Sequence, residues 1–546
     1  MHYLSDPDGK SKPHVMGIDR STLVQLELLS SAKPGKSKQA SLLAAINCTR
    51  TTVGNRLLRS TIMAPPCRLA TIHARQELVS TFLKNEPFFM SILGQLQNME
   101  PIDKMITDIV MVPLDFVKHK PDTNGKHMDA VSTVTGVRAS SNAVGKQNDM
   151  NAKVARKGIS SLIGIKTTLS MLPLLASTLK EHLKVSTGAC NEQERNTEAS
   201  IASDKSSLLV GLGGDFGSLA NSTFSAPRFS RKHYLLRGII YALTQPELKE
   251  IESEIEKEVR GNLTFSRASN VAVHQECFAL RGSPAGASEC LDVYRKAFLH
   301  NVDEIYQKAD EYAELHGIHV TVKYQNQRGH FLSLPASSSN DLPSIFIYPS
   351  KSGSGSGTYI HCTTEEVQSL NARAQDNVRE LLFLTHRRIQ ELLAFASSKY
   401  DALARVSDAI ALLDLCHGFA DKVTLSDEEW TAPKLFDREE GETAENGEAI
   451  SIVNGKCAVD VAALNQGMSR MVVNDTRCSP SSTFTIVSGV NGSGKSTYLK
   501  QVAMTVLLAH CGSWVPADEA HIPVRYRCRF RFRCSGLSLI SPFIIR

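Results

Sequence analysis

The residues best suited to chemistry form one short segment of the 546-residue chain, Gly489-Val-Asn-Gly-Ser-Gly-Lys-Ser496. It fills every fixed position of the pattern G-x-x-x-x-G-K-[ST]. The glycines let the backbone curl so that successive N–H groups point at phosphate oxygens. Lys495 supplies a mobile cation for the β- and γ-phosphates, and Ser496 offers a hydroxyl to Mg²⁺. The segment predicts a nucleotide-binding loop, with Ser496 at the metal, made of Gly489, Val490, Asn491, Gly492, Ser493, Gly494, Lys495, Ser496 and Thr497.

The sequence on both sides of this loop fits the strand–loop–helix order that such a loop requires. Phe484 to Val487 is an apolar run that predicts a buried strand. Gly512 stands where the following helix should end. The apolar positions that recur at helical spacing between them are Leu499, Val502, Ala503, Val506 and Leu507. A chance glycine-rich turn with a surface lysine is the alternative, and this order of elements disfavours it.

Hydrolysis of a bound nucleotide needs more than this loop. A P-loop ATPase uses a second strand that ends in an acidic residue, which holds Mg²⁺ and orients water. After Ser496 the only acidic side chains are Asp518 and Glu519, which follow Trp514 to Ala517 rather than an apolar strand. Pro516 disfavours a central strand there. The residues predict nucleotide binding without the machinery for turnover, so no catalytic residue is assigned and enzymatic activity stays open.

Arginines alternate with aromatic and other residues in the last part of the sequence. They stand at Arg525, Arg527, Arg529, Arg531 and Arg533. On a strand all of them would face one way, which would suit a nucleic-acid-binding ribbon. The favoured interpretation is a non-native end from a truncated or mis-spliced reading frame, because the segment interrupts a domain that P-loop topology requires to continue.

Composition places the chain among ordinary globular proteins. Apolar residues make up 42% and charged residues 21%, which excludes wholesale disorder. The length predicts roughly three to four domains. Twelve cysteines without a C-x-x-C pair give no zinc or redox motif and indicate a reducing compartment. The net charge of +5 is compatible with nucleic-acid binding, and no membrane span is predicted, because the best candidate, 161–178, carries Lys166 and Pro173.

Periodicity predicts a mainly helical first half. Residues 17–115 read as helices, with runs from Ile72 to Leu83 and from Phe88 to Leu96. Two polar stretches, 118–157 and 187–230, interrupt this pattern and are expected to loop out. The first contains six Lys and two Arg against three Asp, so a phosphate-contacting arm is the alternative to a solvated loop.

Two helices, a hairpin and a linker are predicted next. Thr244-Gln-Pro-Glu247 has the form of a capping box. The first helix has apolar positions at Leu248, Ile251, Ile255 and Val259. The second ends at Gly317 and has one apolar face formed by Tyr294, Phe298, Val302, Ile305, Ala309 and Tyr312. Ile318 to Tyr324 and Phe331 to Leu334 predict the strands of a hairpin, and Ser350 to Gly357 predicts a flexible linker.

The last third of the chain begins with a long helical pattern. It runs from Thr363 to about Ala420, with Thr363 and Glu366 at capping-box spacing. The acidic stretch from Asp437 to Glu448 is expected to be a solvated loop between domains. Ile450 to Val453 and Thr483 to Val487 predict strands of a final α/β domain.

These segments together resemble the MutS family. Val487 to Gln501 and Gly512 to Ala517 are similar to the family's ATPase domain. Met471-Val-Val-Asn-Asp475 resembles the segment before its P-loop strand, where the adenine packs. Thr51 to Leu58 is similar to the start of the lever domain, and Phe278 to Leu334 to the clamp.

The resemblance implies a multidomain, mainly α fold, in which helical lever and clamp arms with a small β-containing clamp precede an incomplete α/β P-loop ATPase domain of the ABC type. The expected divisions are an N-terminal tail at 1–16, a lever and core helical domain at 17–260 with the two polar inserts, a clamp at 261–362, returning lever helices at 363–425 and a truncated ATPase domain at 426–546.

Particular residues acquire roles from the resemblance. Met471 and Val472 are expected to pack on the adenine of ATP, with burial in the domain core as the alternative. Lys323 and Arg328, at the predicted hairpin, are candidate contacts for DNA phosphates, with simple solvation of the hairpin as the alternative. Val490 stands where the family usually has proline. The family's mismatch-reading domain, acidic strand, signature segment and dimerising C-terminus are not expected in this sequence.

Within the family, the segment from Gly494 to Gln501 most resembles the meiotic branch. The implied function is an ATP- and Mg²⁺-binding clamp subunit that binds branched recombination intermediates, such as Holliday junctions, and promotes meiotic crossing over in the nucleus. The implied partner is a second MutS homologue in a heterodimer, with no membrane involved. A mismatch-repair subunit that binds mismatched duplex, and a catalytically inactive scaffold for DNA or protein, are the alternatives.

Overall fold

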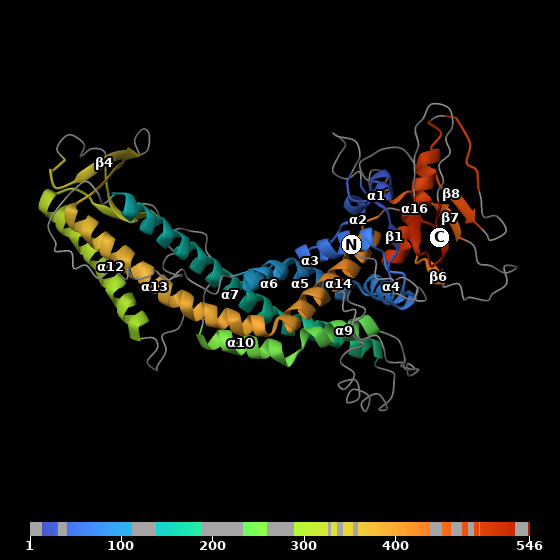
Figure 1. The fold of residues 1–546 in the computed structure, drawn as a ribbon, viewed down its shortest axis with the longest axis horizontal. Coiled ribbons are helices and arrows are strands. Elements are labelled where there is room, and N and C mark those ends of the chain that lie inside the picture. Colours follow the sequence, from blue (N-terminus) through green and yellow to red (C-terminus); the bar gives the residue numbers. More distant parts are fainter. Residues whose placement is uncertain are drawn as a thin grey trace. The chain divides into compact units, whose positions relative to one another are not determined.

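The chain folds as two compact units in a computed structural model (Figure 1). The first comprises Met1–Asp103, Met171–Gln245 and Asp401–Arg546, and the second Lys104–Ser170 and Pro246–Tyr400. The structure describes residues 14–30, 41–111, 138–187, 233–258, 289–325, 329–335, 342–352, 359–426, 428–436, 450–459, 472–478, 485–490, 492–529 and 544–545. The described part is mainly helical with small sheets, as the sequence predicts.

Short capped helices open the first unit. They are α1 (Arg20–Gln25), α2 (Leu42–Ile46), α3 (Thr52–Met63), α4 (Leu69–Lys84), α5 (Glu86–Gln97) and α6 (Ile102–Met111), the last continuing into the second unit. The side chains that accept a backbone N–H at the first turns of α1, α2, α3 and α5 are Asp19, Ser41, Thr51 and Asn85. The helical prediction for 17–115 is confirmed over the described residues, apart from the two-residue strand β1 (Gly17–Ile18) and the connections.

Two helices form the centre of the first unit. In α14 (Tyr400–Thr424) every residue from Ala409 to Lys422 is buried, and in α16 (Lys495–Cys511) every residue from Gln501 to Cys511 is buried. A helix that is buried on all sides is a core element rather than a surface one. The helix α9 (Tyr234–Leu243) belongs to the same unit.

A four-stranded sheet accompanies α16 in the first unit (Figure 1). Its order is β6 (Lys434–Phe436), β9 (Glu519–Pro523), β7 (Ile450–Gly455) and β8 (Asn474–Cys478), and only the β6–β9 pair is parallel. The strand predicted at Ile450 is therefore confirmed. The expectation that Pro516 keeps a strand from following it is wrong, because Pro516 lies before β9 and removes no hydrogen bond from its ladder.

The strand predicted at Thr483 to Val487 is wrong in its described part. Residues 485–490 lie in no strand, and Ile486 is 77% exposed. Among the described residues, no strand therefore leads into the nucleotide loop.

The alternating arginines contribute one short strand. β10 (Arg527–Arg529) pairs with β1 in parallel and with β11 (Ile544–Ile545) in antiparallel fashion. Cys528 is 1% exposed within it. Arg531 and Arg533 lie outside the described residues, so a longer ribbon stays the untested alternative to a non-native end.

The second unit is a helical arm with a sheet at one end. The helices α12 (Glu289–His316) and α13 (Glu365–Ser398) run side by side (Figure 1), and α10 (Pro246–Glu258) packs on α13. The antiparallel sheet has the order β2 (Thr321–Gln325), β3 (Gly329–Pro335), β5 (Tyr359–Thr363) and β4 (Ile347–Ser352). The hairpin prediction is confirmed by β2 and β3, and Gly317, with φ +62°, follows α12 as predicted.

One hydrophobic core joins the sheet to both helices of the arm. Leu332, Leu334, Ile360 and Cys362 are buried against Ile305, Ala309 and Tyr312 of α12 and Val367 and Leu370 of α13. The apolar face predicted for α12 is therefore confirmed. Phe298 continues it along the arm in a second cluster with Leu381 of α13, against which Tyr294 and Val302 also pack.

Several predicted boundaries are wrong by a few residues. Thr364, not Thr363, caps α13, because its side chain accepts the Val367 N–H. The hydroxyl of Thr244 donates to the Ile240 carbonyl at the end of α9, so it does not cap α10. Ser350 to Ser352 belong to β4 rather than to a linker, because they pair with β5.

Residues 138–157, predicted as part of a polar loop, are helical in α7 (Arg138–Thr187), which continues from the second unit into the first. Its part Ser161–Lys184 is long and apolar enough to cross a membrane by length and composition alone. Leu162, Leu169, Leu172 and Leu179 are all buried inside the protein, as in a core helix. The predictions for 118–137, 188–230, Val259 and 437–448 fall outside the described residues.

Candidate functional site

The glycine-rich loop wraps around the first side chain of α16. Lys495 begins the helix, and its Nζ donates to the carbonyl oxygens of Gly489 and Val490, each at 2.6 Å. Gly492 and Gly494 both have φ +87°, a conformation that side chains rarely tolerate. The structure therefore brings the predicted Lys495 together with Gly489 and Val490 of the same loop.

The open end of α16 lies next to this loop. Gly494 is its N-cap and provides no side-chain hydrogen bond, while Ser496 and Thr497 in the first turn are exposed. The first N–H groups of a helix have no partner within it, and the helix dipole adds positive potential there. Together with Lys495, this end of α16 has the features of a phosphate site. Asn491 lies outside the described residues.

Three side chains that the sequence did not single out hold the first turns of α16. Glu27 pairs with Lys500 at 2.8 Å, the Thr476 hydroxyl donates to the Tyr498 hydroxyl at 3.1 Å, and Asn474 donates to Gln501 at 3.2 Å. Asn474 and Thr476 lie on β8, two and four residues after Val472, which is predicted to pack on adenine. Glu27 gives no local signal, because its partner lies 473 residues away.

Of the two residues predicted to pack on the adenine, the structure describes only Val472. Val472 is 76% exposed, so its alternative assignment to the domain core is wrong. Its carbonyl accepts a hydrogen bond of 3.3 Å from Asn474, the residue that also binds Gln501 of α16. Val487 and Val490 are also exposed, at 37% and 79%. Met471 lies outside the described residues.

No acidic side chain completes the loop in the described part of the chain. Asp518 accepts a hydrogen bond of 2.6 Å from Asn454, and Glu519 begins β9 opposite Val453. Neither has a contact with Lys495 or Ser496 among the described hydrogen bonds and ion pairs. Among the described residues there is also no cluster of three His, Cys, Asp or Glu side chains that could hold a metal ion.

The sheet of the second unit presents a cation and an aromatic ring together. Lys323 is exposed on β2, and its Nζ lies 4.5 Å from the centre of the Tyr359 ring on β5. An ammonium group over an aromatic face gains electrostatic attraction. The strands β2 to β5 contain no Asp or Glu, so nothing on them opposes the approach of a polyanion. Arg328, the other predicted contact, lies outside the described residues.

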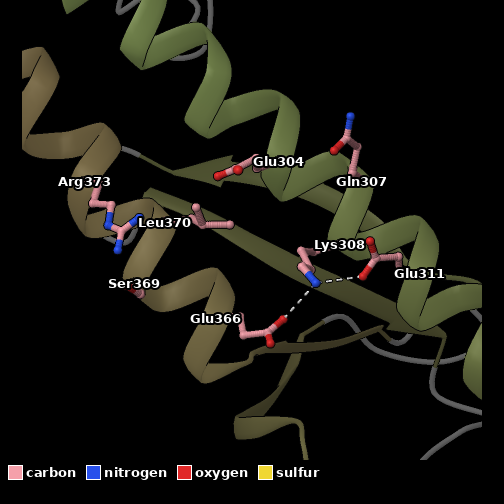
Figure 2. Close-up of a pocket in the computed structure, with 8 residues that line it drawn as sticks. All are labelled: Glu304, Gln307, Lys308, Glu311, Glu366, Ser369, Leu370 and Arg373. Carbon is pink, nitrogen blue, oxygen red and sulfur yellow. Dashed lines mark hydrogen bonds and ion pairs between the residues drawn. The ribbon is translucent and has the colours of Figure 1, made fainter.

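A hollow of about 320 Å³ between α12 and α13 was not anticipated (Figure 2). Lys308 points from α12 toward Glu311 at 2.8 Å and toward Glu366 of α13 at 3.4 Å. The hydroxyl of Tyr312 donates to Glu366 at 2.8 Å, and this bond and the nearby Lys308 lower the pKa of that carboxyl. Because these charges are already paired with one another, the hollow is a junction between two helices rather than a binding site.

Comparison with known families identifies the class of protein. The family model described as MutS domain III matches residues 21–420, and the one described as MutS domain V matches residues 485–537. The first match alone covers most of the chain. The chain therefore belongs to the MutS family.

Particular relatives are similar over nearly the whole chain. MutS protein homolog 4 of Mus musculus is 26% identical over 509 residues, and that of Homo sapiens is 25% identical over 507 residues; each alignment covers 92% of this chain and 42% of the relative. The DNA mismatch repair protein MSH4 of Arabidopsis thaliana is 26% identical over 521 residues, which is 93% of this chain and 54% of the relative. The chain thus spans about half the length of these relatives or less.

Proposed function

We propose that this chain is an ATP-binding clamp subunit of the MutS type that acts on branched DNA in meiotic recombination. The similarity to MutS protein homolog 4 across 92% of the chain supports the meiotic assignment. The observation that carries nucleotide binding is the lysine of the glycine-rich loop, which sits at the open end of α16 with its amine against Gly489 and Val490. Action in the nucleus follows from the proposed role.

The described residues of the loop include the types of group that bind ATP and Mg²⁺. The loop backbone at Gly492 and Gly494 and the first turn of α16 would bind the phosphates, and Lys495 would contribute positive charge. The exposed hydroxyl of Ser496 would be a ligand of Mg²⁺. Val472 and Met471 would lie on the adenine side. The bound nucleotide supplies the free energy that favours one conformation of a clamp over another.

DNA would be bound by the sheet of the second unit. Lys323 is exposed, lies beside the Tyr359 ring and has no carboxylate on the strands around it. Contacts of this kind neutralise phosphates and position a duplex without reading its sequence. Recognition of a junction by shape needs that property. Arg328, close to Lys323 in the sequence, would add a second phosphate contact.

The proposed partner is a second MutS homologue. In the family, each composite ATP site is completed by a segment of the partner subunit. The loop of this chain would then be one half of such a site. This assignment rests on the family resemblance and on the open side of the loop, where Val490, Ser496 and Thr497 are exposed.

A second candidate function is a nucleotide-binding scaffold that does not hydrolyse ATP. The observation that favours it is the position of Asp518 and Glu519, which stand at the beginning of β9 rather than at the end of a strand that meets the loop. A mismatch-repair subunit is the third, since relatives named DNA mismatch repair protein MutS match parts or most of the chain.

Binding to labelled DNA with and without ATP and Mg²⁺ tests the proposal. The purified chain, alone and mixed with a second MutS homologue, is titrated against a four-way junction, a matched duplex and a duplex with one mismatch. A preference for the junction that ATP changes supports the clamp. A preference for the mismatch indicates repair, and DNA binding that ATP does not affect indicates the scaffold.

A further inference from the structure

A buried arginine holds the end of α16 that lies farthest from the nucleotide loop. Arg75 is on α4 and only 5% exposed. Its Nη1 donates to the carbonyl oxygen of Cys511, the last residue of α16, at 3.1 Å. The carbonyl end of a helix carries partial negative charge, which favours a cation there. Arg75 therefore complements the C-terminal end of the helix whose first residue is Lys495.

The burial of the Arg75 guanidinium is not explained by an ion pair among the described residues. Among the described residues no carboxylate pairs with Arg75, and its Nε is buried without a hydrogen-bond partner. Burial lowers the pKa of Arg75, and the thiols of Cys416 and Cys511, whose own pKa values burial raises to about 12, only partly oppose this shift. A buried cation without a partner is costly. Its link to α16 is the favourable contact that the structure provides.

The end of α16 and the helix α4 lie so close together that a side chain at Gly512 would clash with Arg75. Gly512 follows α16 with φ +86°, and a Cβ at that position would lie 2.6 Å from the Arg75 Cβ. On the other side, the Cys511 thiol lies 3.8 Å from the Thr61 carbonyl of α3. The end of α16 is therefore in contact with both α3 and α4, and Arg75 provides the contact with α4.

The helix α16 can move as one rigid element. Its residues from Gln501 to Cys511 are all buried, and a helix of 17 residues is roughly 25 Å long. At one end the helix bears the loop around Lys495, and at the other it ends on Arg75. One packed element thus connects the candidate phosphate site with α4.

We infer that Arg75 is a positioning residue through which the nucleotide-bound state of the loop reaches α4. This inference rests on the proposed nucleotide binding and deepens it. When phosphate binding displaces α16, the contact between Arg75 and Cys511 moves α4 and the helices that pack on it in the first unit. Lys495 contributes to the affinity for the nucleotide, whereas Arg75 transmits the effect of the bound nucleotide to α4.

Hydrogen exchange read by mass spectrometry tests this on the full chain, with and without ATP and Mg²⁺. In the wild type, we expect ATP to slow the exchange of the α4 amides about fivefold. In Arg75→Met a fluorescent ATP analogue still binds with an affinity within about threefold of the wild type, but the effect of ATP on α4 is lost. Gln76→Met is the matched control, because Gln76 on the same helix donates to the Pro433 carbonyl and not to α16. It retains the ATP response.

The outcomes separate the inference from the function on which it rests. If Arg75→Met does not fold, Arg75→Lys, which keeps the charge without the planar donor group, is measured and should lose more than half of the response. A purely structural role would lower stability equally with and without ATP and leave the response intact, which would overturn the inference. So would ATP binding to the wild type with no change in α4. If the wild type does not bind ATP at all, the proposed function fails and the inference with it.

Discussion

Asp414 and Thr51, 363 residues apart in sequence, are joined by two hydrogen bonds in the first unit. The Thr51 hydroxyl donates to Asp414 Oδ2 at 2.6 Å, and the Thr51 N–H donates to the same oxygen at 2.7 Å. The Arg50 N–H adds a bond of 2.9 Å to the other oxygen. A Cβ on Gly54 would lie 2.1 Å from Oδ2, so α3 approaches α14 as closely as glycine permits. The carboxylate thus anchors the start of α3.

Asp414→Ala should destabilise the first unit strongly. The substitution leaves the N–H groups of Arg50 and Thr51 without an acceptor and should lower the free energy of unfolding by about 3 kcal/mol. Urea unfolding followed by circular dichroism measures the loss. Asp408→Ala, at an exposed position of the same helix, should cost less than about 0.5 kcal/mol. Equal losses in the two variants would contradict this role of Asp414.

His510 should make the stability of the first unit depend on pH. Burial lowers the pKa of this imidazole from 6.5 to about 4. Its Nε2 accepts the Arg525 N–H at 2.9 Å, which requires the neutral ring, while its Nδ1–H donates to the Val506 carbonyl at 2.8 Å. The folded state binds fewer protons than the unfolded state between pH 6.5 and 4. The stabilisation is complete above pH 6.5 and is lost as the pH falls toward 4, by about 3 kcal/mol.

Unfolding free energies at pH 7.5 and pH 5 measure this dependence in the wild type and in His510→Gln. The variant should lose less stability on acidification, because glutamine does not titrate. His417 and His182 also have pKa values that burial lowers, so part of the dependence remains in the variant. An identical pH dependence of the two proteins would show that His510 is not responsible.

Lys323→Ala should weaken binding to DNA of any sequence by a similar factor. A phosphate contact releases a counter-ion when it forms, so its loss should reduce the slope of log affinity against log salt by about 1. Fluorescence anisotropy at several salt concentrations gives that slope. The control is Lys399→Ala, since Lys399 already pairs with Glu250 at 3.0 Å. A slope that stays unchanged in Lys323→Ala rules out the proposed contact.

Local signals in the sequence predicted the helices well and the contacts between distant elements poorly. The apolar face of α12, its end before Gly317 and the β2–β3 hairpin follow from periodicity over a few residues. The cap of α13 was misplaced by one residue, because Thr363 and Thr364 are adjacent and equally suitable. The partner of Thr51 could not be predicted, because Asp414 is one of many acidic residues on a helical pattern.

At the nucleotide loop, too, the local features could be predicted from the sequence and the contacts with distant elements could not. Its glycines and Lys495 follow from spacing, since the chemistry is contained within eight residues. The strand expected before it is absent from the described residues 485–487, and its formation would depend on partners distant in the sequence. Arg75 gave no signal, because an arginine within an amphipathic pattern reads as a surface residue until its burial is known.

Nucleotide binding by the glycine-rich loop can be measured with a fluorescent ATP analogue, in the presence of Mg²⁺, on the wild type, Lys495→Ala and Lys500→Met. Lys500 lies on the same helix but pairs with Glu27, so it is the matched control. We expect saturable binding to the wild type and to Lys500→Met, and none detectable to Lys495→Ala. Unchanged affinity in Lys495→Ala, or no binding to the wild type, would contradict the assignment of this loop as the nucleotide site.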